Sequence, residues 1–410
     1  MAVIGSGPAG LAAAEVLAMR GFGVCVYDAM PSPARKFLMA GKSGLNLTKD
    51  EDPRLFRDHI GSTSLNPVLS SFGPEAVISW AEGLGQKVFV GSSGRVFPRS
   101  MKASPLLRQW LQRLTDHGVS LRTRWRWTGW TADGALSFET PDGPQSVRTD
   151  ATVLALGGAS WPRLGSDAAW LGIVRDIGVP LEPFRPANMG FDVDWSERFR
   201  DRWAGAPVKP AGLRYGDQTV RGEFVVSKSG VEGSAIYAIS APLRDALERG
   251  PTAVLVDLVP DHSNAALSAR LSRPRRKASW SNFLRKTTGL SGVRAALAKE
   301  MLPSTSADPG TIASQLKSLP IPLVRPRPVA EAISSAGGIA WEAVTSGLML
   351  KRRPGTFVAG EMLDWEAPTG GYLITTCLAT GRWAGAAAAD WVEDRSADGG
   401  AIPEVFQGHN

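Results

Sequence analysis

The chain opens with a glycine-rich turn between a short apolar run and a segment of small residues. Ala2-Val3-Ile4 is followed by glycines at positions 5, 7 and 10, and then by Leu11–Leu17, which favours a helix. A G-x-G-x-x-G turn between a strand and a helix is typical of a dinucleotide-binding βαβ unit. The first glycine allows the tight turn, the second lets backbone approach a pyrophosphate, and the third lets the helix pack closely on the strand. The free N–H groups of the helix N-terminus then favour bound phosphate.

A second strand arrives at the spacing that this unit requires. Phe22–Tyr27 alternates in polarity and ends at Asp28, about twenty residues after the glycines, where such folds place a ribose-binding carboxylate. Glycines, helix and acid together predict a dinucleotide site.

Two further strands end in glycines, and they extend the prediction to a larger cofactor. Ala151–Leu156 runs into Gly157-Gly158, and Gly355–Val358 leads to Gly360-Glu361. Thr369–Tyr372 then begins a helix of small residues that continues to about Trp391. Backbone N–H groups at the start of a second helix suit the flavin edge of FAD, whereas NAD alone would not need a second binding site of this kind. We therefore expect one FAD, with its pyrophosphate at the first turn.

Proline-rich segments divide the chain. Two proline-rich segments, Pro180–Asn188 and the prolines from 320 to 328, flank a stretch with a different pattern of predicted strands and helices. We expect an FAD-binding domain formed by residues 1–185 and 326–410. The inserted domain, 186–325, is expected to be β-rich over 186–262 and helical over 263–325.

Composition narrows the function classes. Two cysteines, Cys25 and Cys377, exclude a disulfide framework and fit a reducing cytoplasm, and the chain lacks both a metal-ligand spacing and an apolar stretch that could span a membrane. The net charge of +7 lies entirely in residues 186–325, which hold 20 Lys and Arg against 13 Asp and Glu. Arg273–Lys277 with Trp280 and Phe283 is its densest patch. A solvated helix face is the simpler interpretation, so we expect neither a nucleic-acid nor a membrane partner.

Taken together, these pieces resemble the BaiN-like (YhiN-type) family of FAD-dependent flavoproteins over nearly the whole chain. The motifs that carry the resemblance are Gly5–Gly10 with Asp28, Arg35–Thr48, Gly94–Pro98, Leu154–Ser166 and Gly360–Gly385.

The resemblance implies an α/β fold with a glutathione-reductase-type FAD-binding domain, interrupted by an insert with a β-barrel-like part and a small helical part. It implies that Asp28 holds the adenosine ribose, that Glu361 faces the ribityl or pyrophosphate region, and that Gly370, Gly371 and Tyr372 lie against the isoalloxazine. The residues expected to bind the cofactor are Gly5, Gly7, Pro8, Ala9, Gly10, Asp28, Arg35, Lys36, Gly41, Ser43, Gly157, Gly158, Gly360, Glu361, Gly370, Gly371, Tyr372 and Leu373.

The chain departs from the family pattern in three places. Gly41–Thr48 lacks the cysteine of the usual Gly-Gly-Arg-Cys-Asn-x-Thr-Asn, which excludes a thiol mechanism from that loop. Leu373 replaces the usual Asn after Gly-Gly-Tyr, so one hydrogen bond at the flavin edge is in question. Ser227–Gly233 lacks the common histidine, which suggests changed acid–base roles.

The expected reaction is hydride transfer at flavin N5 to a small-molecule substrate held between Lys36–Thr48 and the insert. Lys36, Lys42 and Asn46 are candidates to orient an anionic or carbonyl-bearing substrate, although the lysines could equally bind FAD phosphates or face solvent. Tyr372 is a candidate proton donor, and packing of its ring on the flavin is the alternative. The chain lacks a second G-x-G-x-x-G after a strand, so the electron donor is either NAD(P)H that docks transiently or another partner.

Two other function classes stay open at this stage. The basic insert suggests an RNA-associated flavoenzyme, and the unusual loop at Lys42–Thr48 suggests a flavin-binding regulatory protein without turnover. The substrate and the number of subunits stay undetermined.

Overall fold

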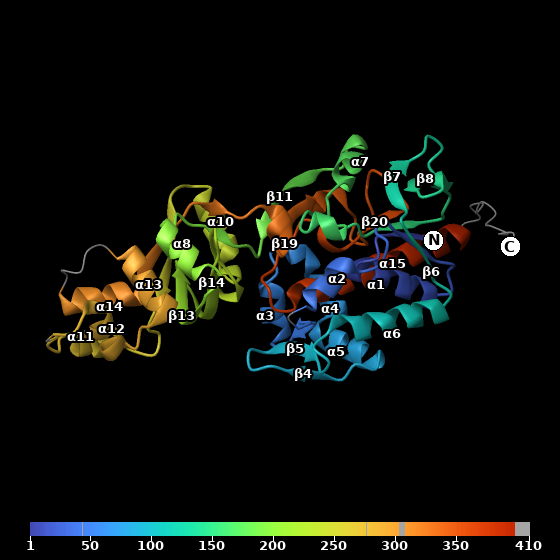
Figure 1. Ribbon diagram of the computed structural model, residues 1–410. Helices are drawn as coiled ribbons and strands as arrows, with labels where there is room; N and C mark the ends of the chain where they lie inside the picture. The colour runs from blue at the N-terminus through green and yellow to red at the C-terminus, as the bar shows by residue number, and fades with distance from the viewer. Residues whose placement is uncertain (43, 276, 303–307, 398–410) are drawn as a thin grey trace. The chain divides into compact units, whose positions relative to one another are not determined.

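The chain forms two compact units (Figure 1). The computed structural model describes residues 1–42, 44–275, 277–302 and 308–397, and the structural statements below concern these residues. One unit comprises Met1–Arg185 together with the chain from Ser334 onward, and the other comprises Pro186–Ile333. We refer to them as the nucleotide unit and the insert. The second boundary differs from the expected Arg325 because β18 (Arg325–Pro326) pairs with β12 (Phe191–Asp192) inside the insert, and Ile333 N donates to Asn188 O.

A five-stranded parallel sheet forms the centre of the nucleotide unit. The strand order is β20-β10-β1-β2-β6, and every neighbouring pair is parallel. Its strands are β1 (Ala2–Ile4), β2 (Cys25–Asp28), β6 (Ser120–Thr123), β10 (Thr152–Leu154) and β20 (Thr356–Val358). The strands β1, β10 and β20 are fully buried, in keeping with the apolar character of their sequences. β10 and β20 enter this sheet from distant parts of the chain and place both glycine turns at the same edge.

Two helices of small residues pack against each other beside this sheet. α1 (Pro8–Met19) lies along α15 (Tyr372–Ala397), the long C-terminal helix (Figure 1). A Cβ on Gly381 would lie 2.0 Å from the carbonyl oxygen of Ala9, and one on Gly385 would lie 2.8 Å from that of Ala13. Glycine at these positions is therefore what allows the two backbones to touch.

Smaller elements complete the nucleotide unit. A three-stranded antiparallel sheet has the order β3-β5-β4 and a second has the order β7-β8-β9, while β11 pairs with β19. The strands are β3 (Thr48–Lys49), β4 (Val88–Val90), β5 (Arg95–Pro98), β7 (Arg126–Trp130), β8 (Leu136–Thr140), β9 (Gly143–Val147), β11 (Leu181–Ala187) and β19 (Ser334–Ile339). The helices are α2 (Arg35–Ala40), α3 (Pro53–Asp58), α4 (Asn66–Ser71), α5 (Pro74–Gly83), α6 (Ala103–Asp116) and α7 (Trp170–Asp176). Short 3-10 turns are η1 (Thr63–Leu65), η2 (Pro162–Leu164), η4 (Trp341–Ala343) and η5 (Gly360–Met362).

The insert is built on an antiparallel sheet of order β17-β16-β13-β14-β15-β12-β18. Its strands, besides β12 and β18, are β13 (Pro207–Tyr215), β14 (Gln218–Val226), β15 (Gly230–Glu232), β16 (Thr252–Asp257) and β17 (Leu319–Leu323). The helices are α8 (Glu197–Trp203), α9 (Ser234–Tyr237), α10 (Ser240–Leu247), α11 (Asn264–Leu271), α12 (Trp280–Thr288), α13 (Gly292–Met301) and α14 (Pro309–Lys317), and η3 is Val329–Glu331.

Two expectations for the insert differ from this sheet. The β-barrel-like part is a seven-stranded sheet in which β17 and β18 occupy opposite ends and, among the described residues, do not pair with each other. The stretch 263–325, expected to be helical, ends in β17 and the start of β18, because the chain returns along β16 after the helices. Buried and exposed residues alternate along β17, and its prolines occupy the exposed positions. This explains why a proline-rich segment can still form a strand.

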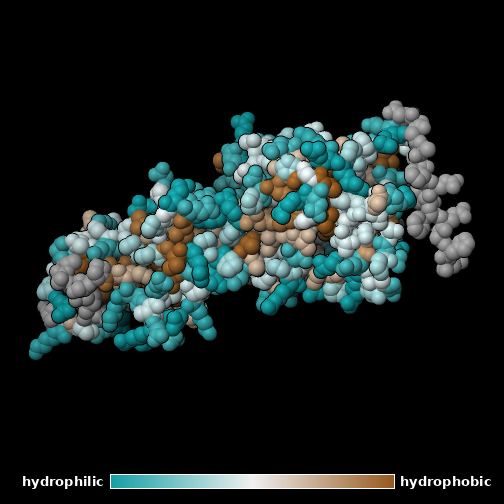
Figure 2. Space-filling view, turned by 90° about the horizontal axis from the view of Figure 1, so that it is seen from above, coloured by the Kyte–Doolittle hydropathy of each residue, from teal (hydrophilic) through white to brown (hydrophobic). Residues whose placement is uncertain are grey.

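The face of the molecule shown in Figure 2 is mainly hydrophilic. Figure 2 shows hydrophilic side chains over most of the face in view, with hydrophobic side chains gathered in separate patches. Within the described ranges, none of the helices combines the length and apolar character needed to cross a membrane.

Candidate functional site

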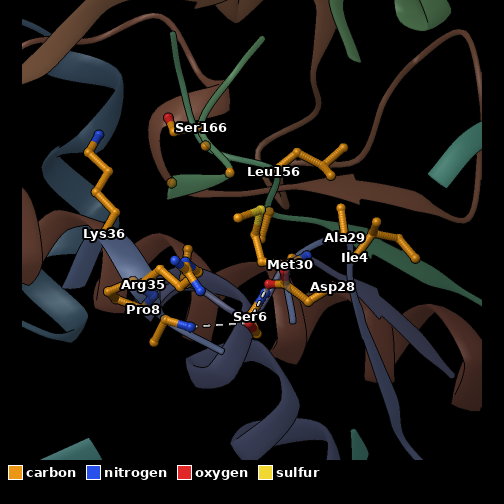
Figure 3. A pocket seen from close by; sticks show the side chains of 18 of the residues that line it. Ile4, Ser6, Pro8, Asp28, Ala29, Met30, Arg35, Lys36, Leu156 and Ser166 are labelled. Atoms are coloured by element: carbon orange, nitrogen blue, oxygen red, sulfur yellow. Dashed lines mark hydrogen bonds between the residues drawn. The ribbon is translucent and has the colours of Figure 1, made fainter. Parts of the chain in front are cut away.

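A pocket lies at the carboxyl ends of the central parallel strands, where open α/β sheets bind their ligands. It is lined by the turn after β1, the end of β2, the first half of α2, the chain after β10, η5 and Cys377 of α15 (Figure 3). The lining residues include Gly5–Ala9, Tyr27–Met30, Arg35–Phe37, Ala155–Gly157, Leu164–Ser166 and Ala359–Glu361. The first turn and the glycines after β10 and β20, which the sequence links only by pattern, therefore meet around one cavity.

The three glycines of the first turn have different steric surroundings. A Cβ on Gly5 would lie 2.2 Å from Ala155 O, and Gly5 has φ of +102°, so this position requires glycine. A Cβ on Gly10 would lie 1.9 Å from Gly5 O. A Cβ on Gly7, by contrast, would meet no atom within 4 Å, although Gly7 lines the pocket. Gly7 thus leaves open the space beside the helix N-terminus into which a bound pyrophosphate would fit.

Asp28 is held by the glycine turn itself. Its Oδ2 accepts hydrogen bonds from Ser6 N at 2.8 Å and from the Ser6 hydroxyl, and its Oδ1 accepts one from Met30 N at 2.7 Å (Figure 3). The Ser6 hydroxyl also accepts from Ala34 N. Ser6 was not among the predicted residues, and the x of G-x-G gives no signal for its role. The carboxylate keeps accepting capacity beyond these three bonds, as binding of a ribose hydroxyl would need.

Lys36 forms an ion pair within the lining of the pocket. Its Nζ lies 2.6 Å from Glu361 Oε2 and 2.7 Å from Ser160 Oγ. This ammonium is therefore engaged by Glu361, rather than aimed at solvent as one prediction allowed. Burial raises the pKa of the neighbouring Cys377, so its thiol stays neutral and serves as a small packing group.

Several buried polar atoms around the site have no partner among the described residues. Arg35 Nε and Ser166 Oγ belong to side chains that line the pocket. Asn46 Oδ1 and Thr376 Oγ1 are likewise unpaired. Thr375, the neighbour of Thr376 in the chain, donates from its Oγ1 to Thr48 Oγ1 at 2.9 Å. Buried polar atoms are normally hydrogen-bonded, so these orphaned groups fit a polar ligand that runs from the pocket toward the start of α15.

The expected flavin-edge residues lie at the start of α15, outside the lining of the pocket. Gly370 and Gly371 have φ of +137° and +102°, and a Cβ on Gly371 would lie 2.4 Å from the carbonyl carbon of Thr48. Leu373 follows on the first turn of α15. Among the remaining predicted residues, Gly157 and Gly360 line the pocket, while Gly41 and Gly158 pack against Ala103 and Ser335. Ser43 lies outside the described residues.

The structure gives Tyr372 a different environment from either predicted role. Its side chain is buried and its ring packs at 4.7 Å from Phe56 and 5.2 Å from His59. Its hydroxyl donates to Glu51 Oε1 at 2.6 Å and accepts from Lys49 Nζ at 2.9 Å. Burial and the bond to Glu51 raise the pKa of Tyr372, so the phenol stays neutral. Through these contacts Tyr372 holds Lys49–His59 against the start of α15. Its ring is enclosed by the protein, so it has no free face to stack on a flavin.

The chain matches the HI0933-like protein Rossmann domain over residues 1–387. It belongs to the HI0933-like family. The 3-dehydro-bile acid delta(4,6)-reductase of Clostridium scindens is 26% identical over 95% of this chain and 98% of its own length. The ribosomal RNA dihydrouridine synthase of Haemophilus influenzae is 22% identical over 64% of each protein. Among solved structures, a quinol fumarate reductase subunit of E. coli is similar in fold, with a TM-score of 0.50 and 15% identity over 97% of this chain and 72% of that one.

Membership of this family makes the chain a FAD-dependent oxidoreductase with a Rossmann-type FAD-binding domain. The residues present fit the cofactor, because the open space at Gly7 and the orphaned atoms Arg35 Nε and Ser166 Oγ are what an extended dinucleotide would fill and satisfy. A metal centre has no support in the described ranges, where His, Cys, Asp and Glu form no cluster of three that could hold an ion.

Proposed function

We propose that this protein is a FAD-dependent reductase that adds hydrogen across a carbon–carbon double bond conjugated to a carbonyl. The names of the two curated relatives described above indicate reduction of a ring double bond, in a 3-dehydro-bile acid and in uridine. These rings differ in size and polarity, but in each the double bond is activated by a carbonyl. The observation that carries the proposal is the dinucleotide cradle at Gly5–Gly10 in a chain of this family.

We assign roles to the chain's own residues from their positions. The N-terminal amides of α1 bind the phosphates, and Asp28 binds the adenosine ribose. The Lys36–Glu361 pair, with its atoms 2.6 Å apart, orients the ribityl region. The backbone N–H groups after Gly371, at the positive end of α15, stabilise negative charge on the flavin edge. Asn46 Oδ1 and Thr376 Oγ1 contribute further hydrogen bonds on this side.

Flavin supplies hydride transfer when it is bound, and the reduction needs one hydride and one proton for each double bond. We propose NAD(P)H as the electron donor that docks transiently, because the chain carries one G-x-G-x-x-G turn and that turn is assigned to FAD.

An anaerobic absorbance titration tests the donor and the cofactor together. The purified holoprotein is expected to be yellow and to bleach with NADH or NADPH. A 3-oxo-4-ene steroid acid and uridine are then added separately to the reduced protein, with the saturated steroid as the control. Return of the yellow colour with one unsaturated compound, but not with the saturated one, supports the proposal. Protein that bleaches but reoxidises with neither compound contradicts the assigned substrate class. Protein that neither contains nor binds FAD contradicts the cofactor assignment.

An RNA substrate is a second candidate, favoured by the charge of the insert. Exposed basic side chains gather along α11–α12 and the segment between them, namely Arg273, Arg275, Lys277, Arg285 and Lys286. Arg276 and the side chain of Trp280 lie outside the described part of the chain. Electrostatic binding to RNA falls steeply with salt. Affinity for a ribosomal RNA fragment that drops about tenfold or more between 50 and 200 mM salt and is lost in a variant carrying R273Q, R275Q and K277Q would favour this candidate. Salt-independent or absent binding would exclude it.

A further inference from the structure

The sheet β3-β5-β4 carries two cations opposite each other. Lys49 of β3 and Arg95 of β5 are register partners in an antiparallel pair, so their side chains extend from the same face. Like charges at directly opposite positions are destabilising unless a counter-charge lies nearby. Lys49 has one, because its Nζ lies 2.6 Å from Glu51 Oε2. Arg95, in contrast, has no such ion pair among the described residues.

The guanidinium of Arg95 is unpaired within the described residues. It makes neither a hydrogen bond nor an ion pair with any side chain there, and the residue is half-buried. A Cβ built on Gly370 would lie 4.0 Å from Arg95 Nε, so the guanidinium sits beside the turn that begins α15. The neighbouring groups are Tyr372, which is neutral, Lys49 with Glu51, and His59 at 3.4 Å from Glu51. The cluster thus has more positive than negative charge, at the positive end of a helix.

An apolar surface continues from Arg95 along the same face. Phe97 lies two positions further along β5 and therefore extends to the same side as Arg95. Its ring packs at 5.8 Å from Phe89 of β4, which is 39% exposed. Met101, 38% exposed, lies beside Phe97, because a Cβ on Gly44 would contact both side chains. This sheet contacts α5 and lies at the lower edge of the nucleotide unit in Figure 1.

We propose that Arg95 binds a carboxylate on an amphipathic small-molecule substrate whose apolar body covers Phe97, Phe89 and Met101. The occupant is anionic because the guanidinium has no counter-charge among the described residues. Its body is apolar because the partly exposed rings of Phe97 and Phe89 extend from the same face of the sheet. Arginine suits this role, since its planar fork holds a carboxylate by two parallel hydrogen bonds. The inference rests on the proposed function only in naming the ligand a substrate. It also moves the anion-binding role away from Lys36, which is already paired with Glu361.

A binding experiment tests the site without turnover. The holoprotein is titrated with 2-naphthoate, an aromatic ring with one carboxylate, and with its neutral analogue 2-naphthamide, while ligand fluorescence and the visible spectrum of FAD are followed. The wild type is expected to bind the carboxylate about tenfold more tightly than the amide, because a charge-assisted hydrogen bond contributes about 1.4 kcal/mol or more. R95Q is expected to bind both compounds equally and to retain FAD, whereas R95K keeps part of the preference.

The control is R108Q, which removes an exposed arginine from α6 and is expected to behave like the wild type. Equal binding of naphthoate and naphthamide to the wild type, or an unchanged preference in R95Q, would overturn the proposal. Loss of FAD from R95Q would also overturn it, since the guanidinium would then serve the cofactor. The proposed reduction can fail for every enone while this preference persists, so the two hypotheses are separable.

Discussion

The helix pair α1–α15 of the nucleotide unit and the core of the insert are packed in different ways. In the nucleotide unit, alanine and glycine bring the backbones of α1 and α15 into contact, as at Gly381 against Ala9. In the insert, large side chains such as Phe224, Val254 and Ile321 fill a core of their own between the sheet and its helices. The nucleotide unit also has a core of large side chains, including Trp110, Phe138 and Phe357, so the close backbone contact is a property of the α1–α15 pair beside the dinucleotide site. Such contact tolerates far less added volume than a core of interchangeable aliphatic side chains.

The strongest test of this contrast is Gly10→Ala. Alanine normally stabilises a helix relative to glycine by about 0.5–1 kcal/mol. Here its Cβ would lie 1.9 Å from Gly5 O, so we expect a loss of about 3 kcal/mol or more from the nucleotide unit, together with loss of FAD. Flavin content and thermal unfolding measure the two effects, and the unfolding step of the insert should stay unchanged. The control is Gly23→Ala, where a Cβ meets nothing within 4 Å. Normal flavin content in G10A would contradict the packing argument.

Asp192→Asn addresses the insert in the same way. The Asp192 carboxylate lies 2.7 Å from Arg325 Nε and 2.9 Å from Arg327 Nη1, and its side chain is 11% exposed. Burial opposes its ionisation, but the hydrogen bonds from Arg327 and Arg325 prevail and lower the pKa of Asp192 below 3.8. We expect D192N to cost about 2 kcal/mol in the unfolding free energy of the insert, since two cations lose their partner.

The pH dependence of this cost has a definite sign. A lowered pKa in the folded state gives stability that is present above the unfolded pKa and is lost as the pH falls through the folded one. The difference between wild type and D192N, measured by urea unfolding, should therefore shrink as the pH falls from about 5 to about 3. The FAD content of D192N at neutral pH should match that of the wild type. A stability difference between the two proteins that grows toward acid pH would refute the role given to the Asp192 ion pairs.

Tyr372→Phe returns to the nucleotide unit with a smaller expected effect. The change removes the bonds to Glu51 and Lys49 but keeps the ring on Phe56, so we expect a loss of about 1 kcal/mol. The raised pKa of Tyr372 gives stability that is present below 10.0 and is lost as the pH rises above it. The advantage of the wild type over Y372F should therefore diminish in alkaline buffers. Tyr27, whose pKa burial also raises, is common to both proteins and cancels. An advantage that does not change with pH would contradict this account.

Gly7→Ala should change stability least and still abolish tight cofactor binding. Gly7 has φ of −72°, which alanine adopts, and open space beyond its Cβ position. We expect a change of about 0.5 kcal/mol or less in the apoprotein, where a weaker helix N-cap offsets the restricted unfolded chain. FAD titration of the apoprotein should nevertheless show much weaker binding, because the methyl group would occupy the space assigned to the pyrophosphate. Normal FAD affinity in G7A would move the pyrophosphate elsewhere.

Local spacing predicts part of this molecule well. The first turn, α1 and the carboxylate of Asp28 follow from glycine spacing and from an acid at the end of a strand, all within thirty residues of sequence. These features depend on neighbours in the chain, so a pattern can specify them.

Long-range partners explain what the sequence could not specify. Glu15 of α1 is buried and pairs with Arg113 of α6 and Arg382 of α15, both far away in the sequence. The environment of Tyr372 depends on Glu51, more than three hundred positions away, and no local pattern links them. The open sheet of the insert was missed for the same reason, since strand pairing is non-local and the resemblance alone suggested a barrel.

The order in which the chain is synthesised gives the split nucleotide unit one more consequence. β10 finds its outer neighbour β20, and α1 finds α15, only after the whole of Pro186–Ile333 has been made. The insert has a self-contained core and can fold as soon as it leaves the ribosome. The insert is therefore complete before the nucleotide unit can close. Until α15 has been made, the face of α1 that packs against it stays uncovered. Chains truncated before residue 356 and released from the ribosome should therefore hold a folded insert together with an open, chaperone-accessible N-terminal half.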